Sequence, residues 1–176
     1  MQRRRTLVAC TILLFFSLII SSGCQSSVSK WPSNDSKQLA TIIRFPFQPQ
    51  QVQWQPISLP VNNSEDNRSI PGPTDMTGVV AILTFDEQTL ETIMRDADPL
   101  ASDKPNINNA FIFDWYPQAL LKHIISGQAG SARFVTLQGY SIHPFLKSST
   151  ENTRESFFVR IPGTTDLFLY YQNWRK

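Results

Sequence analysis

Two histidines, His123 and His143, are the general-base candidates of this 176-residue chain. His143 follows Ser141 by two residues in the segment SIHPF, and side chains two residues apart on an extended strand share one face. A serine–histidine contact is therefore geometrically open to this chain, although no G-x-S-x-G turn that would expose a nucleophile accompanies it. His123 is expected beside Lys122 on the solvated side of a helix, which favours an ordinary surface role.

Asp114 is the most interesting carboxylate, because it lies within the apolar segment FIFDWY. Strand alternation would put it opposite Phe113 and Trp115, on the same face as Ile112 and Tyr116. A carboxylate in a strand is either a paired structural group or a ligand contact, and both readings stay open. Since tryptophan and tyrosine are typical anchors of binding surfaces, we take Asp114, Trp115 and Tyr116 as a candidate binding site.

The acidic stretch RDADPLASD superficially suggests a calcium loop. It does not fit the EF-hand template, because Ala101 stands where the glycine is required and Ile107 where the bidentate acid is required. None of the seven glycines has the spacing of a phosphate-binding loop. We therefore expect a solvated acidic loop, no metal site and no cofactor.

The elements that must position these residues follow from hydrophobic periodicity. Extended segments are expected at 39–47 and 51–59, and Pro46, Pro49 and Pro56 confine them to sheet edges. The run GVVAILTF (78–85) is apolar on both faces and predicts a central strand. A capping box of Thr84 and Glu87 predicts that a helix over 86–97 follows it.

The second half repeats this pattern once and then changes to strands. AFIFDWY (110–116) predicts a strand, and a helix over 117–126 should begin at Pro117 and end before Gly127. Strands are predicted at 133–142, 156–161 and 167–171, with PGTTD as the turn of the last hairpin. Together these elements predict an α+β fold: a two-layer mixed β-sheet with two helices packed on it, ending in an antiparallel meander.

Composition and charge exclude several classes of protein. The chain is 41% apolar and carries 16 basic against 14 acidic residues, which gives a formal charge of +2. If the segment that holds Arg3, Arg4 and Arg5 is removed, subtracting these three charges from +2 leaves −1. A nearly neutral domain has no electrostatic footprint for nucleic acid, which we exclude as a partner.

The N-terminus has the pattern of an export signal. Arg3 to Arg5 precede the apolar run LVACTILLFFSLII, and the small residues Ser21, Ser22 and Gly23 lead to Cys24. The apolar run is shorter than the ~20 residues that span a bilayer as a helix, so a cleaved signal is favoured over a transmembrane anchor.

The Gly23-Cys24 junction resembles the lipobox of bacterial lipoproteins, in which a cysteine is lipidated and becomes the mature N-terminus; Ser21 departs from the leucine usual there. The resemblance covers residues 3–24 only. It implies thioether-linked diacylglycerol and an N-terminal acyl group such as palmitate at Cys24. Because Cys10 would be discarded, Cys24 would be the only mature cysteine, and lipidation would remove a free thiol from an oxidising compartment. The alternative is a plain signal peptide cut nearby.

These observations predict a signal peptide at 1–23, a flexible tether at 24–38 and one domain at 39–176. The resemblance places the protein on a cell membrane, and Gln25 in place of an aspartate favours the outer membrane, facing the periplasm. We expect a binding or assembly module whose partner is an envelope protein or a cell-wall component. The alternative is an envelope hydrolase with a site built from Ser141, His143 or Asp114.

Overall fold

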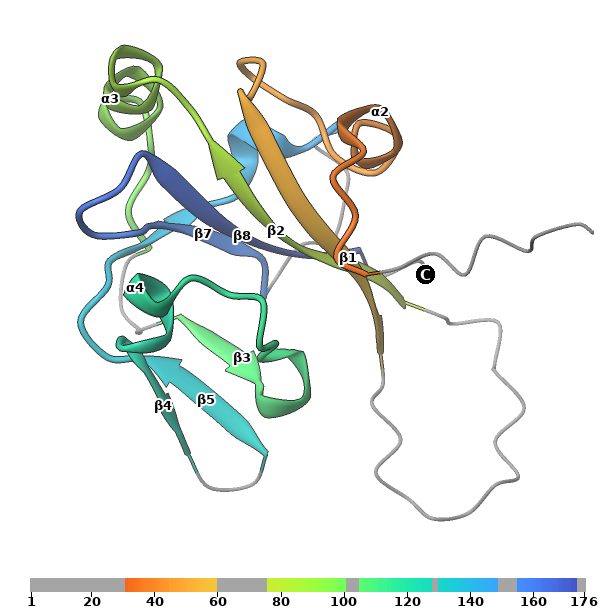
Figure 1. The fold of residues 1–176 in the computed structure, drawn as a ribbon, viewed down its shortest axis with the longest axis vertical. Coiled ribbons are helices and arrows are strands. Elements are labelled where there is room, and N and C mark those ends of the chain that lie inside the picture. Colours follow the sequence, from red (N-terminus) through yellow and green to blue (C-terminus); the bar gives the residue numbers. More distant parts are fainter. Residues whose placement is uncertain (1–30, 60–75, 101–104, 128–129, 149–154, 174–176) are drawn as a thin grey trace, which may run out of the picture. The chain divides into compact units, whose positions relative to one another are not determined.

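The computed structural model describes residues 31–59, 76–100, 105–127, 130–148 and 155–173 (Figure 1). The chain divides into two units, 1–30 and 31–176, and all described residues belong to the second. The predicted export signal, Cys24 and Gln25 therefore lie outside the described residues. Among the described residues, no helix has both the length and the apolar character required to cross a bilayer.

The centre of the fold is a five-stranded sheet in the order β1-β2-β8-β7-β6. Its strands are β1 (Gln51–Leu59), β2 (Met76–Thr84), β6 (Gly139–Ser141), β7 (Phe157–Arg160) and β8 (Asp166–Asn173). As predicted from its two apolar faces, β2 is central, and its register with β8 pairs Ala81 with Leu169. β1 forms an edge, where the missing N–H of Pro56 costs the ladder nothing.

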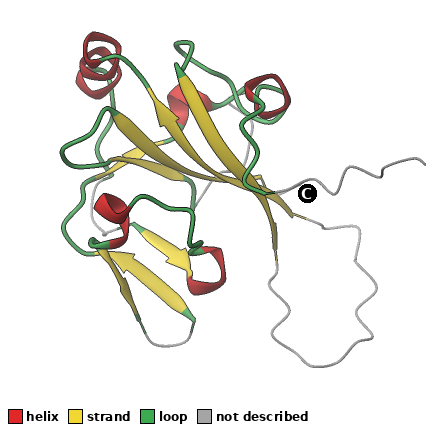
Figure 2. Ribbon diagram, viewed as in Figure 1, coloured by secondary structure: helices red, strands yellow, loops and turns green. Residues whose placement is uncertain are grey.

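One face of this sheet is covered by helices (Figure 2). They are α2 (Ser36–Leu39), α3 (Glu87–Arg95) and the 3-10 turn η2 (His143–Phe145). Leu90 and Ile93 of α3 are buried at the three-residue spacing of one helix face. With Trp54, Leu83 and Leu169 from the strands they belong to one apolar core.

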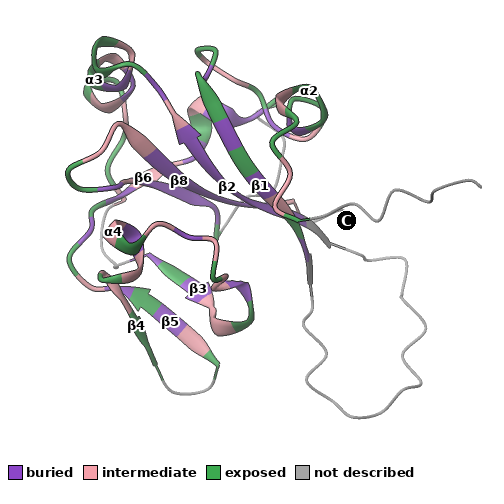
Figure 3. Ribbon diagram, in the orientation of Figure 1, coloured by how far each residue is buried: buried purple, intermediate pink, exposed green. Residues whose placement is uncertain are grey.

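The opposite face packs against a second, smaller sheet in the order β3-β5-β4. Its strands are β3 (Asn106–Asn108), β4 (Ile124–Ser126) and β5 (Ser131–Phe134), accompanied by the 3-10 turn η1 (Asn109–Phe111) and by α4 (Gln118–Leu121). Phe134 of β5 and Phe168 of β8 belong to this second core, with ring centroids 5.4 Å apart. As Figure 3 shows, β2 and β8 are largely buried between the two covers, whereas β1 alternates between buried and exposed residues.

The α+β class and the closing antiparallel meander are confirmed. The turn PGTTD does join β7 to β8, and Phe157, Val159 and Ile161 face one core together. Every pair of described strands is antiparallel, however, so no mixed sheet forms among these residues. The second helix of the predicted pattern is shortened, and β4 follows it in place of its C-terminal half.

Three predicted elements differ in the structure. AFIFDWY is not a strand: Ala110 and Phe111 belong to η1, which begins where the Asn108 side chain accepts a hydrogen bond from the Ala110 N–H at 2.9 Å. The helix expected over 117–126 ends at Leu121, and its apolar residues Ile124 and Ile125 enter β4 instead. The single strand expected over 133–142 is divided between β5 and β6, which belong to different sheets.

The N-cap of α3 and the start of the domain also differ from the prediction. α3 is capped by Asp86, whose carboxylate accepts from the Thr89 N–H at 2.8 Å, and Thr84 does not cap it: its hydroxyl donates to Asp166 at 2.7 Å. Residues 31–38, placed in the tether by composition, contact the domain: Ser33 pairs with Trp54, and Asp35 caps α2. Leu39, expected in an extended segment, is the buried last residue of that helix.

Candidate functional site

The predicted trio Asp114, Trp115 and Tyr116 lies in a turn between η1 and α4 and separates into three environments. Tyr116 is buried, and its hydroxyl donates to the Phe111 carbonyl at 2.6 Å. Burial, with a smaller contribution from Tyr170, holds the pKa of Tyr116 well above its usual range. Tyr116 is thus a neutral structural group at physiological pH.

Trp115 is half-buried, and Asp114 is exposed. The indole N–H of Trp115 donates to the Gln55 side chain on β1 at 3.1 Å, while the parallel ring of Phe113 lies 6.2 Å away. Because the segment turns, Trp115 and Tyr116 pack against each other, with ring centroids 4.7 Å apart, instead of facing opposite sides. The trio therefore supplies one exposed carboxylate, that of Asp114, beside two aromatic rings that pack against each other.

Ser141 and His143 are neighbours, but the contact between them is local. The backbone N–H of His143 approaches the Ser141 hydroxyl oxygen at 3.4 Å, where β6 ends and η2 begins. Among the described residues, no hydrogen bond or ion pair joins Asp114 to either of them. His123, the other histidine, is half-buried and contacts the Thr136 hydroxyl through Nδ1.

The charged side chains of α3 are used to fasten the helix. Arg160 of β7 forms ion pairs with Glu87 at 3.1 Å and Glu91 at 2.7 Å. Arg160 and Glu87 border an open depression of about 540 Å³ that is also lined by Gly163 and Asp166. Since each charge there has a partner, we assign the cluster to docking α3 on the sheet.

The acidic loop contributes no metal site in the part of the chain that the structure describes. Asp96 pairs with Arg95 at 3.2 Å and Asp98 is exposed, whereas Asp103 lies outside the described residues. No group of three or more histidine, cysteine, aspartate or glutamate side chains is placed to hold an ion among those residues.

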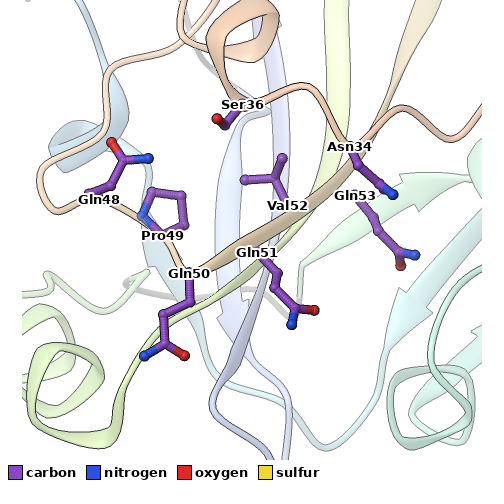
Figure 4. A pocket seen from close by; sticks show the side chains of 8 residues that line it. All are labelled: Asn34, Ser36, Gln48, Pro49, Gln50, Gln51, Val52 and Gln53. Atoms are coloured by element: carbon purple, nitrogen blue, oxygen red, sulfur yellow. The ribbon is translucent and has the colours of Figure 1, made fainter.

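A groove of about 370 Å³ at the outer edge of β1 is the site that sequence reasoning missed (Figure 4). We call it the amide groove; it is lined by Asn34, Ser36, Gln48, Pro49, Gln50, Gln51, Val52 and Gln53. Five of these eight side chains end in a carboxamide, and none is ionisable. Figure 4 shows Gln48 and Pro49 on one side, Asn34 and Gln53 on the other, and Val52 between them. The sequence signal was the glutamine-dense run QPQQVQ at 48–53.

The groove exists because the chain leaves the sheet edge at Asp35. Ser33 is paired with Trp54 through two backbone hydrogen bonds of 2.8 and 2.9 Å. Continued antiparallel pairing would bring Asp35 opposite Val52, but Asp35 turns away and caps α2 instead, accepting from the Lys37 and Gln38 N–H groups. The edge beside Val52 is thereby left open.

Backbone groups join the amide side chains in the groove. Because both backbone bonds of Trp54 point outward to Ser33, alternation in an antiparallel ladder directs the N–H and C=O of Val52 outward as well. Gln50, which directly precedes β1, donates its N–H to the Thr84 carbonyl at 2.8 Å and so faces β2. The backbone N–H and C=O of Val52 therefore point toward the groove beside the neutral amides.

Comparison with known proteins adds no family: no family model, curated protein or solved structure matches this chain.

Proposed function

We propose that this protein is a lipid-anchored envelope lipoprotein whose folded domain is a periplasm-facing binding module. The observation that carries the proposal is the junction of an arginine-led apolar run with Gly23 and Cys24. Several acyl chains on Cys24, each methylene contributing ~0.8 kcal/mol when buried, would hold the domain at the membrane far more firmly than one chain.

The amide groove supports the binding part of this proposal. Its volume of about 370 Å³ lies within the ~300–1,000 Å³ of small-ligand sites. Its side chains are exposed except for Val52 and Pro49, which are buried, and Ser36, which is half-buried. Exposed amides on an edge strand contribute little to a core, so recognition is the role we assign to them. The partner is an envelope protein or a cell-wall component.

Chain length limits how far the domain can stand from its anchor. Seven residue steps separate Cys24 from Trp31, the first described residue. At ~3.3–3.6 Å per residue, a fully extended chain of that length spans no more than ~25 Å. A lipidated Cys24 would therefore keep β1 and its groove close to the membrane surface.

Metabolic labelling with a radioactive fatty acid tests the anchor. Wild-type protein should be labelled and processed, and Cys24→Ala should remain an unlabelled precursor, because the lipid-dependent peptidase requires the modified cysteine. Cys10→Ala is the matched control, since Cys10 lies in the discarded run and its loss should leave labelling intact. An unlabelled wild-type protein would refute lipid anchoring.

Residence in the outer membrane rests on Gln25. In lipoproteins that this chain resembles, an aspartate after the modified cysteine retains the protein in the inner membrane. Sucrose-gradient fractionation of a two-membrane host should place wild-type protein with outer-membrane markers and Gln25→Asp with inner-membrane markers. Wild-type protein in the inner-membrane fraction would contradict this assignment.

A further inference from the structure

We propose that the amide groove binds a neutral saccharide unit of an envelope glycan; this inference rests on the binding function proposed above. The first support is the chemistry of the lining. A carboxamide offers two donors and an acceptor, which complement the hydroxyl and acetamido groups of a sugar, since each of these both donates and accepts hydrogen bonds. Five carboxamide side chains and Ser36 line the groove.

The absence of ionisable lining residues points away from a charged ligand. Asp35 is adjacent in sequence, but its carboxylate is engaged with two backbone N–H groups at 2.9 and 3.0 Å. Phosphate and carboxylate ligands are normally bound by arginine or lysine, and neither residue lines the groove. A neutral, polyhydroxylated ligand satisfies the amides without leaving an unpaired charge.

The geometry also argues against an extended peptide. Addition of a strand requires outward-directed backbone groups at alternate positions along an edge. On β1 the position of Trp54 is occupied by Ser33, and Pro56 has no N–H to offer. The outward-directed backbone groups of β1 are thus interrupted at Trp54 and Pro56, which breaks the continuous edge that an added strand needs, whereas one compact ring fits beside Val52.

Two exposed aromatic side chains lie close in sequence to the two chain segments that line the groove. Among the described residues only Trp31, Phe47 and Ile125 are large apolar side chains with substantial exposure. Phe47, 41% exposed, directly precedes Gln48, and Trp31, 37% exposed, packs edge-on against Trp54 at 5.2 Å. Large exposed rings next to polar groups offer a surface for the apolar face of a sugar ring.

The test uses the full-length lipidated protein in detergent micelles. The protein is first screened on an array of neutral oligosaccharides built from hexoses and N-acetylhexosamines. The strongest binder is then titrated calorimetrically. A capped peptide of alternating threonine and valine serves as the extended-chain probe. We expect saturable saccharide binding and none of the peptide.

Variants locate the site. Gln50→Ala and Gln53→Ala should each raise Kd about fivefold, the effect of one lost hydrogen bond. Gln88→Ala, an exposed glutamine on α3, is the matched control and should stay within about twofold, as an ordinary surface change does. Thermal melts of all three should coincide with that of the wild type, because the three side chains are exposed.

Two outcomes refute the saccharide proposal, and a third replaces the ligand. No binding to any arrayed saccharide refutes it, as does saccharide binding that survives the Gln50→Ala/Gln53→Ala double variant. Peptide binding that the same double variant abolishes would replace the saccharide with a protein partner and leave the proposed binding module standing. Failure of the lipoprotein proposal is read separately, from fatty-acid labelling of Cys24 on the same material.

Discussion

Phe168 links the two layers of the second core, and its truncation should be among the most damaging single changes in the domain. Its side chain is fully buried on β8, and its ring lies 5.3 Å from Tyr116, 5.4 Å from Phe134 and 6.2 Å from Phe157. These partners come from the turn before α4, from the small sheet and from the neighbouring strand. One ring therefore holds three separate segments together.

We expect Phe168→Ala to lower the free energy of unfolding by about 3–5 kcal/mol, the usual cost of a phenylalanine cavity. A domain of this size loses roughly 2–4 °C of Tm per kcal/mol, so Tm should fall by about 10 °C. Urea denaturation and calorimetry measure both quantities. Phe47→Ala is the matched control, because its exposed ring should cost no more than about 0.5 kcal/mol.

A double-mutant cycle tests whether the ring contacts matter beyond burial. Phe168→Ala combined with Phe134→Ala should be non-additive by about 0.5–1.5 kcal/mol, the range of aromatic pair energies. Strictly additive losses would show that the small sheet does not depend on this ring. A Phe168→Ala loss equal to that of Phe47→Ala would refute the placement of β8 between two cores.

Three further predictions concern the start, the titration and the end of the domain. Asp35→Ala should cost about 1 kcal/mol in urea denaturation, because α2 loses its N-cap, whereas Asp35→Asn should be nearly neutral. Burial raises the pKa of Tyr116 and Tyr170, so above pH ~10 the unfolded state releases tyrosine protons that the folded state keeps. Stability should therefore be complete below that pH and fall above it by up to about 1.4 kcal/mol per pH unit per tyrosine. Urea midpoints that stay constant up to pH 11 would contradict this. Truncation after Thr164 removes β8, and the loss of its large buried side chains at ~1.5–3 kcal/mol each should cancel much of the ~5–15 kcal/mol that stabilises a typical domain. A cooperative melt at the wild-type temperature would show otherwise.

Local patterning determined much of the large sheet. The run GVVAILTF is apolar at every position that a strand would bury on either side, so it had to be central, and it is. The proline at position 56 required an edge, and β1 is one. The hairpin around Gly163 was equally readable, because a turn needs a residue that tolerates positive φ, and Gly163 has φ of 74°.

The second cover of the sheet could not be derived in this way. The segment FIFDWY is compatible with a strand, by its alternation, and also with a turn that clusters its aromatic side chains. Contacts with Gln55, Phe168 and Tyr170 stabilise the turn. Likewise, the stripe from Leu120 to Ile125 has helical spacing, but pairing of Ile124 with Phe134 converts its end to strand. Propensity is weaker than tertiary packing in such short segments.

The amide groove shows the same division most clearly. The sequence supplies the chemical content of the groove, the glutamines of 48–53, and the signal-like pattern before Cys24 on which the proposed location rests. Its shape depends on Ser33 meeting Trp54, residues 21 positions apart, and on Asp35 leaving the edge to cap a helix. A single chain does not encode such distant pairings as a local pattern, because their free energy arises only when the whole sheet has formed.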